Sequence, residues 1–167
     1  MDNSNEAQEK YIHFVNCIES LNTAWRILNK IKEEKDNPLS YFAFQFAIIE
    51  YSKSYKDANS AFKNEKGKPI KKHKLATDFI PQKHLALHTK IIDARDKILA
   101  HLDLDIRDAK IYIQNTERGK NIIRSQNLLN LAQEKKDIDE IINLIEETLY
   151  AMEKEIKTLG DNLAANV

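Results

Sequence analysis

Arg95 is the residue in this sequence that most needs a chemical explanation, because it lies among aliphatic residues of an expected helix. At about 100° per residue, one face of that helix carries Leu85, Ile91, Ile92, Ile98, Leu99 and Leu102. Arg95 falls in the middle of this face, where an unpaired charge loses much of its hydration energy. We expect either an internal ion pair with Glu50 or Asp57, or a cleft in which the planar guanidinium binds a phosphate.

Three histidines share the segment with Arg95. His88 lies one heptad before Arg95 and close to the same line, where it would support the site, and His84 lies a turn earlier. His101 would lie about 9 Å further along the helix axis than Arg95 and about 120° around it. The long arginine side chain and fraying at the helix end would still let both groups reach one cleft mouth. An imidazole there titrates near neutral pH and suits proton transfer.

Residues 95–101, Arg-Asp-Lys-Ile-Leu-Ala-His, resemble the signature of the HEPN superfamily. HEPN proteins are small antiparallel helical bundles, usually dimeric, with this motif near the end of the third core helix. Many are metal-independent endoribonucleases of toxin–antitoxin, phage-defence or RNA-processing systems. The resemblance implies that Arg95 binds the scissile phosphate, that His101 transfers protons and that Asp96 orients them. The chain departs from the family pattern in its long insertion, residues 103–125.

The reaction implied by this resemblance is acid–base cleavage of RNA. The 2′-hydroxyl attacks the adjacent phosphorus and leaves a 2′,3′-cyclic phosphate, without a metal ion. In a symmetric homodimer two copies of His101 would supply both an acid and a base. The expected partners are RNA, a second copy and an antitoxin. The alternative is a non-catalytic helical module that binds RNA or protein, in which Arg95 closes a buried ion pair.

Two basic segments are candidates for RNA binding. The loop at residues 62–75 includes six lysines against one glutamate, and the excursion at residues 103–125 carries Arg107, Lys110, Arg118, Lys120 and Arg124 around Tyr112. The residues that we expect to steer RNA, or to stack a base in the case of the tyrosine, are Lys68, Lys71, Lys72, Arg107, Tyr112 and Arg118. The competing interpretation is two solvated loops of a neutral protein.

A metal site is the weaker interpretation of the histidines. His84 and His88 have acceptable spacing for two ligands on one helical face, with His73 as a conceivable third. No HExxH glutamate accompanies them, and glycine-rich phosphate loops are absent from the sequence. We therefore expect no metal and no cofactor.

Helical periodicity and composition predict an all-α fold. Gly and Pro number three each, charged residues make up 31%, and apolar residues recur at helical spacing. We expect a single domain, residues 1–167, built as an antiparallel up-down bundle. Its four principal helices are expected at residues 5–35, 38–62, 81–102, and from 127 or 137 to 159. Asn37 would cap the second helix and Gly160 would end the last.

An irregular segment or a small hairpin is expected at residues 103–125, before the last helix. Leu104, Ile106, Ile111 and Ile113 show some alternation, and a turn could fall at Glu117, Arg118 and Gly119. The insertion would therefore leave the helical body intact.

The second expected helix has more apolar surface than one bundle core requires. Phe44, Ile48 and Tyr51 form one stripe, and a second stripe on nearly the opposite side consists of Phe42, Phe46 and Ile49. Either the helix is central in its own bundle, or the second stripe faces another chain. We favour a homodimer.

Overall charge and targeting signals indicate little about the partner. Lys plus Arg equals Asp plus Glu at 26 each, so any affinity for a polyanion must come from a local patch. Cys17 is the single cysteine, which excludes an intramolecular disulfide and fits a reducing compartment. The sequence shows no signal peptide and no apolar run of membrane-spanning length. We expect a cytoplasmic protein without a membrane partner.

Overall fold

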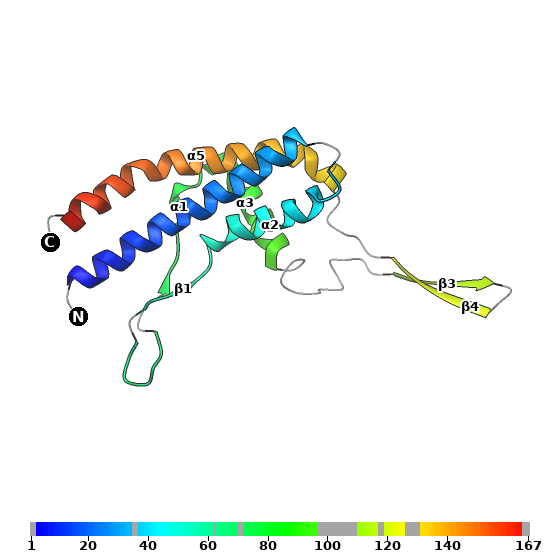
Figure 1. Ribbon diagram of the computed structural model, residues 1–167, viewed down its shortest axis with the longest axis horizontal. Coiled ribbons are helices and arrows are strands. Elements are labelled where there is room, and N and C mark those ends of the chain that lie inside the picture. The colour runs from blue at the N-terminus through cyan, green and yellow to red at the C-terminus, as the bar shows by residue number, and fades with distance from the viewer. Residues whose placement is uncertain are drawn as a thin grey trace.

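The computed structural model describes residues 3–34, 37–61, 63–69, 72–96, 110–116, 119–125 and 131–164 (Figure 1). In chain order its elements are α1 (Asn3–Glu33), α2 (Ser40–Lys53), β1 (Ala58–Asn59), β2 (Lys72–His73), the 3-10 turns η1 (Thr77–Phe79) and η2 (Gln82–His84), α3 (Leu85–Ala94), β3 (Lys110–Thr116), β4 (Gly119–Ser125) and α5 (Leu131–Ala164). The prediction of a mostly helical fold with four principal helices is confirmed.

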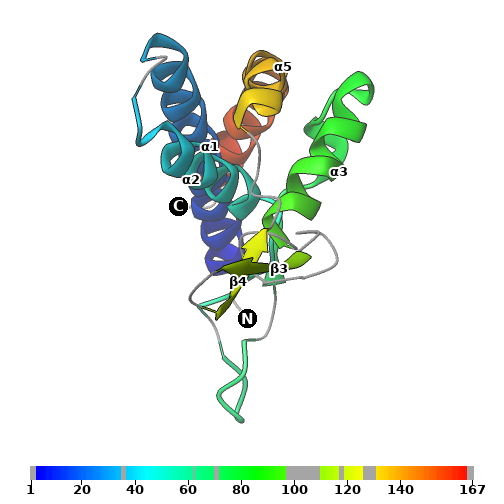
Figure 2. The same ribbon diagram turned by 90° about the vertical axis from the view of Figure 1, so that its right-hand side faces the viewer.

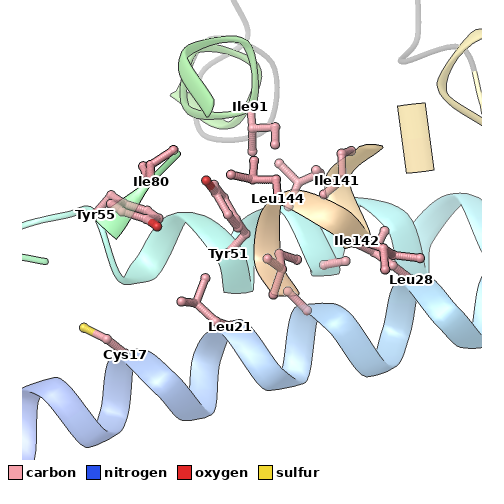
Figure 3. Packing of buried hydrophobic residues seen from close by; sticks show 14 of the residues in the cluster. Cys17, Leu21, Leu28, Tyr51, Tyr55, Ile80, Ile91, Ile141, Ile142 and Leu144 are labelled. Carbon is pink, nitrogen blue, oxygen red and sulfur yellow. The ribbon is translucent and has the colours of Figure 1, made fainter. Parts of the chain in front are cut away.

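The helix α1 is the element on which α2 and α5 pack. Its buried side chains follow the alternating three- and four-residue spacing of a heptad seam, and they are Phe14, Cys17, Leu21, Ala24, Leu28 and Ile31. The helix α5 runs antiparallel to it, as Trp25 Nε1, 2.8 Å from Glu146 Oε1, and the Lys10–Glu155 pair at 3.7 Å demonstrate. Figure 3 shows Leu21 and Leu28 of this seam beneath Tyr51 and Leu144.

The helix α2 also runs antiparallel to α1, but it ends nine residues before the position expected from the sequence. Two tertiary bonds account for the early end. Ser54 Oγ donates to the Cys17 carbonyl at 3.1 Å, and the Ser54 carbonyl accepts the Leu75 N–H at 3.0 Å. Asn37 does not cap this helix as expected, because α2 begins at Ser40 with Leu39 as its N-cap residue and without a side-chain cap bond. Asn37 Oδ1 instead accepts the Leu39 N–H at 2.9 Å in the turn that precedes the helix.

The helix α3 packs on α5 and α2 and crosses them steeply, as its nearly end-on view in Figure 3 shows. Viewed from the end of the bundle, α5 lies between α1 and α3 (Figure 2). Lys83, just before α3, bonds Glu147 at 2.7 Å, and Lys90 of α3 pairs with Asp137, which lies nearer to the start of α5. The buried part of α3 is centred on His88 and Ile91. Its core contact is therefore short.

Two hairpins leave the helical body. The strands β1 and β2 pair antiparallel at the base of the first, and a bridge between Lys63 and Pro69 continues it. Its described residues, 63–69, are exposed, and Gly67 supplies a left-handed φ of 71°. The second, β3 with β4, projects away from the helices (Figure 1) and pairs Ile113 with Ile122. Of the two alternatives expected for this insertion, the hairpin is therefore present.

The helix α5 corrects one expectation. Gly160 does not end it, because the helix continues to Ala164. An ideal Cβ at Gly160 would lie 3.7 Å from Tyr11 Cε2 of α1, which is an ordinary contact. Packing against the start of α1 therefore carries the helix through a residue of low helix propensity.

Within the described part of the chain, no helix combines the length and the apolar composition needed to cross a bilayer.

We predict that Gly160→Ala stabilises the protein and that Gly67→Ala destabilises it. Alanine at Gly160 removes the backbone entropy of a helical glycine and meets only Tyr11, so the free energy of unfolding should rise by about 0.5–1 kcal/mol. Alanine at Gly67 must adopt a positive φ, which costs about 1 kcal/mol. Urea denaturation followed by circular dichroism measures the free energy of unfolding of both variants. A decrease for Gly160→Ala as well as for Gly67→Ala would contradict a helix α5 that continues through residue 160.

Candidate functional site

Arg95 lies at the last described turn of α3, one turn beyond the buried part of that helix. Its backbone N–H bonds both the Ile91 and the Ile92 carbonyl, and at Arg95 and Asp96 the helix widens to π-type geometry. The Arg95 side chain is 34% exposed, so the expectation that it lies in the middle of a buried face is wrong. The buried residues of α3 are His88 and Ile91, so the core contact of this helix ends one turn before Arg95. Widened turns of this kind are frequent at functional sites.

Asp96 holds Arg95 and Lys56 together. Arg95 Nη1 donates to Asp96 Oδ1 at 2.9 Å, and Lys56 Nζ donates to the other carboxylate oxygen. The hydrogen bond from Lys56, and then that from Arg95, keeps the pKa of Asp96 below its ordinary value. Asp96 is therefore ionised at neutral pH, and its two oxygens each fix one cation at the end of α3.

The carboxylates expected to support Arg95 have other partners. Glu50 is buried on α2 and pairs with Lys53, which lies one turn further along the same helix. Asp57 bonds Lys72 Nζ at 2.9 Å, across the base of the first hairpin. The prediction of an internal ion pair between Arg95 and either carboxylate is therefore wrong. Among the described residues, Arg95 pairs with Asp96, and both side chains are partly exposed.

His88 is part of the core and faces the aromatic residues of α2. Its Nδ1 lies 2.8 Å from Tyr51 Oη, and its ring is 4.5 Å from the ring centre of Tyr55. Burial, and secondarily the charge of Lys74, lowers the pKa of His88. Burial raises the pKa of Tyr51 far above its ordinary value and that of Tyr55 to about 12. His88 is therefore a neutral packing residue, and its contacts are with these tyrosines.

The remaining histidines that the sequence singled out lie apart. His84 Nε2 is 3.6 Å from Glu147 Oε1 on α5, whereas His73 Nε2 is 3.1 Å from Glu9 Oε2 on α1. Within the described ranges, no three side chains of the kinds that bind metals converge. His84, His88 and His73 therefore lie in three separate places in the fold.

The expected RNA-binding residues divide between two surfaces and the undescribed segments. Lys68 is exposed in the first hairpin, Lys72 is at its base, and Tyr112 is 53% exposed on the projecting second hairpin. The candidates that lie outside the described residues are Lys71, His101, Arg107 and Arg118. The base of the first hairpin adjoins the Arg95 site, because Lys56 bonds Asp96 and its neighbour Asp57 bonds Lys72.

Lys56 is a site residue that the sequence reasoning missed. The second helix expected from the sequence reached residue 62 and therefore included position 56, but no role was assigned to Lys56. In the structure it follows the end of α2 and reaches α3, forty residues further along the chain. The contact joins residues forty positions apart, so helical spacing could not have indicated that Lys56 lies beside Asp96.

Comparison with known protein families finds none that matches the chain, and comparisons with curated proteins and with solved structures find no match either.

We predict that Arg95→Ala has little effect on stability. A pair between partly exposed groups contributes about 0–1 kcal/mol, so the free energy of unfolding should fall by less than about 1 kcal/mol. Arg26→Ala, at an exposed position of α1, is the control for loss of an arginine. Chemical denaturation measures both variants, and a loss of about 3–5 kcal/mol at Arg95 would instead indicate a buried structural ion pair.

Proposed function

We propose that this protein is a metal-independent endoribonuclease of the HEPN type. Arg95 binds the scissile phosphate, Asp96 orients the guanidinium, and His101 transfers a proton. The observation that carries the proposal is the partial exposure of Arg95 together with its anchoring by Asp96. A guanidinium has five N–H donors, and the bond to Asp96 takes one, so a phosphate can bind the same group bidentately.

The proposed reaction needs only proton transfer and charge stabilisation. A base removes the proton of the RNA 2′-hydroxyl, whose oxygen attacks the adjacent phosphorus. The bond from phosphorus to the 5′-oxygen breaks, and an acid protonates that oxygen. Arg95 stabilises the additional negative charge on the phosphate oxygens during this step. The products are a 2′,3′-cyclic phosphate and a 5′-hydroxyl end.

Delivery of RNA to this site is assigned to the first hairpin. Lys68 is exposed at its tip, and the Lys72–Asp57 pair at its base adjoins Lys56 and Asp96. Exposed lysines attract the phosphate backbone without regard to sequence, and salt weakens this attraction. Tyr112 offers an exposed ring on the second hairpin for stacking with a base. A cytoplasmic toxin–antitoxin or phage-defence setting, with a protein antitoxin as partner, belongs to the same proposal.

The alternative function is a non-catalytic helical module that binds RNA or protein. One observation favours it, namely the exposure of Ile113 and Ile122, which face the same side of the second hairpin. An isolated two-stranded hairpin is marginally stable in water, and a partner that covered these isoleucines would stabilise it. The two functions differ in whether bound RNA is cut.

We predict that the purified protein cleaves single-stranded RNA in the presence of EDTA. Arg95→Ala and His101→Ala should each lower the rate by about 100-fold or more, because each removes a group that acts in the transition state. Arg26→Ala should retain the activity. Denaturing gels with 5′-labelled RNA measure the rate, and phosphatase resistance identifies the cyclic phosphate. Equal rates in all three variants would refute the proposal, and binding without cleavage would establish the alternative.

We also propose that the protein is a homodimer that uses the exposed face of α2. Phe44, Ile48 and Tyr51 are buried in the bundle, as the sequence predicted. Phe42 and Phe46, one turn apart, remain 64% and 49% exposed. Covering both rings would remove a large apolar area from water, and a twofold axis would make the patch its own complement. In the proposed dimer the two copies of His101 contribute to one composite site.

The dimer is expected to depend on Phe46. Phe46→Glu places a charge in the interface, and it should convert the dimer to a monomer at micromolar concentration without unfolding it, since the side chain is half exposed. Tyr150→Glu, at a position 79% exposed on α5, is the matched control and should remain dimeric. Multi-angle light scattering measures the mass. A wild-type protein that is a strict monomer would exclude the interface and the composite site.

A further inference from the structure

A pocket of about 340 Å³ lies between α1 and the base of the first hairpin, and neither Arg95 nor Asp96 is among the residues that line it. Its wall combines the side chains of Phe14, Leu75 and Phe79 with two imidazoles, those of His13 and His73. Phe14 and Phe79 meet edge to face, with ring centres 5.6 Å apart, so the apolar wall is a packed aromatic surface. A concave, mostly apolar pocket with a few convergent polar groups is the usual form of a small-molecule site.

Glu9 fixes one imidazole of this pocket. Its carboxylate accepts bonds from Ser60 Oγ at 2.7 Å, from the Ala61 N–H at 2.6 Å and from His73 Nε2 at 3.1 Å. The Ser60 hydrogen bond is the largest of several interactions that hold the pKa of Glu9 below its ordinary value. Glu9 therefore remains an anion, ties the hairpin base to α1, and sets the orientation of the His73 ring. His73 is nearly covered, at 10% side-chain exposure.

His13 is the second imidazole, and it lies beside the first. The two ring centres are 5.4 Å apart and the planes are tilted by 36°. Burial, and then the neighbouring His73, lowers the pKa of His13. A neutral His13 has one donor and one acceptor nitrogen, and the contact of Nε2 with Cys17 leaves Nδ1 for a ligand. Cys17 Sγ lies 3.6 Å from its Nε2, and burial raises the pKa of that thiol to about 11, so no thiolate competes with an anion there.

The rim of the pocket is basic. Lys10, Lys72 and Lys74 line it against one carboxylate, Glu155. Glu155 lies 3.7 Å from Lys10, both side chains are more than a third exposed, and a pair of this kind is weak enough for a ligand anion to displace. Lys72 bonds Asp57 at 2.9 Å, whereas the pair of Lys10 with Glu155 is longer, so Lys10 is better able than Lys72 to bind a ligand.

We propose that this pocket binds a nucleoside monophosphate group, with the base against Phe79, which Phe14 supports from the core, and the phosphate between Lys10 and His13. The aromatic wall accounts for the base, because any of the nucleobases can stack on an aromatic side chain. The lysine and the imidazole account for the phosphate, since both donate to anionic oxygens. A free nucleotide and the 5′-terminal nucleotide of an RNA share this chemistry. The site is separate from the proposed cleavage centre and does not depend on it.

The test is titration of the full-length protein with adenosine monophosphate, followed by calorimetry and by the NMR signals of the imidazoles. Binding should shift the signals of His13 and His73. Lys10→Ala and His13→Gln should each raise the dissociation constant by about tenfold or more. Lys30→Ala, at an exposed position near the other end of α1, and Arg95→Ala should leave it unchanged. Circular dichroism identifies any variant that has unfolded, and the exposed Lys10 is the variant least sensitive to that problem.

Two further ligands complete the experiment. A short RNA carrying a 5′-phosphate, compared with the same RNA carrying a 5′-hydroxyl, distinguishes the two sources: preference for the phosphorylated end supports an RNA terminus, and binding of the mononucleotide alone supports a free nucleotide. Inorganic phosphate should bind more weakly than adenosine monophosphate, because it lacks the ring. Absence of binding at millimolar nucleotide, or a dissociation constant unaffected by both Lys10→Ala and His13→Gln, would overturn the proposal. Loss of RNA cleavage in Arg95→Ala with unchanged nucleotide binding would separate this site from the cleavage centre.

Discussion

The rest of the structure depends on the burial of one continuous stripe along α1. Six side chains from Phe14 to Ile31 leave water there, between α2 on one side and α5 on the other. Burial of each large aliphatic side chain contributes about 1.5–3 kcal/mol, and this stripe supplies Leu21, Leu28 and Ile31. The helix α3 touches the core over a much shorter length. Its orientation is consequently set by pairs with α5 and by the contact of His88 with Tyr51.

Sequence periodicity could predict these helices because burial repeats along them. The aliphatic residues of α5 and the Phe44, Ile48 and Tyr51 stripe recur at intervals that only a helix places on one side. The ends of the helices could not be predicted in the same way. Ser54 ends α2 through bonds to Cys17 and Leu75, and Gly160 continues α5 because Tyr11 lies beside it. Each end depends on a partner that is distant in the chain, which local propensity does not contain.

The candidate sites show the same division. Arg95 could be singled out because a charge on an apolar face is unusual, and the exposed Phe42 and Phe46 followed from an excess of aromatic residues on α2. The direction in which α3 crosses the bundle could not be inferred, and for that reason Arg95 was expected to be buried. The Glu9–His73 contact joins residues 64 positions apart, so nothing in the spacing of either segment indicated it. Unusual residues can thus be recognised in the sequence more readily than the residues that contact them in the fold.

The projecting hairpin of β3 and β4 has a consequence for how this protein can evolve. In the described part of the chain these strands pair only with one another, and the side chains of residues 112–116 and 119–122 are exposed. Substitutions there are constrained by strand pairing and by Gly119, whose φ is 122°, but they remove nothing from the helical core. Most helical positions, by contrast, must keep both their volume and their spacing. The hairpin can therefore accumulate changes faster than the helices, and a lineage that retains the same helical body is free to acquire a different arm and a different specificity.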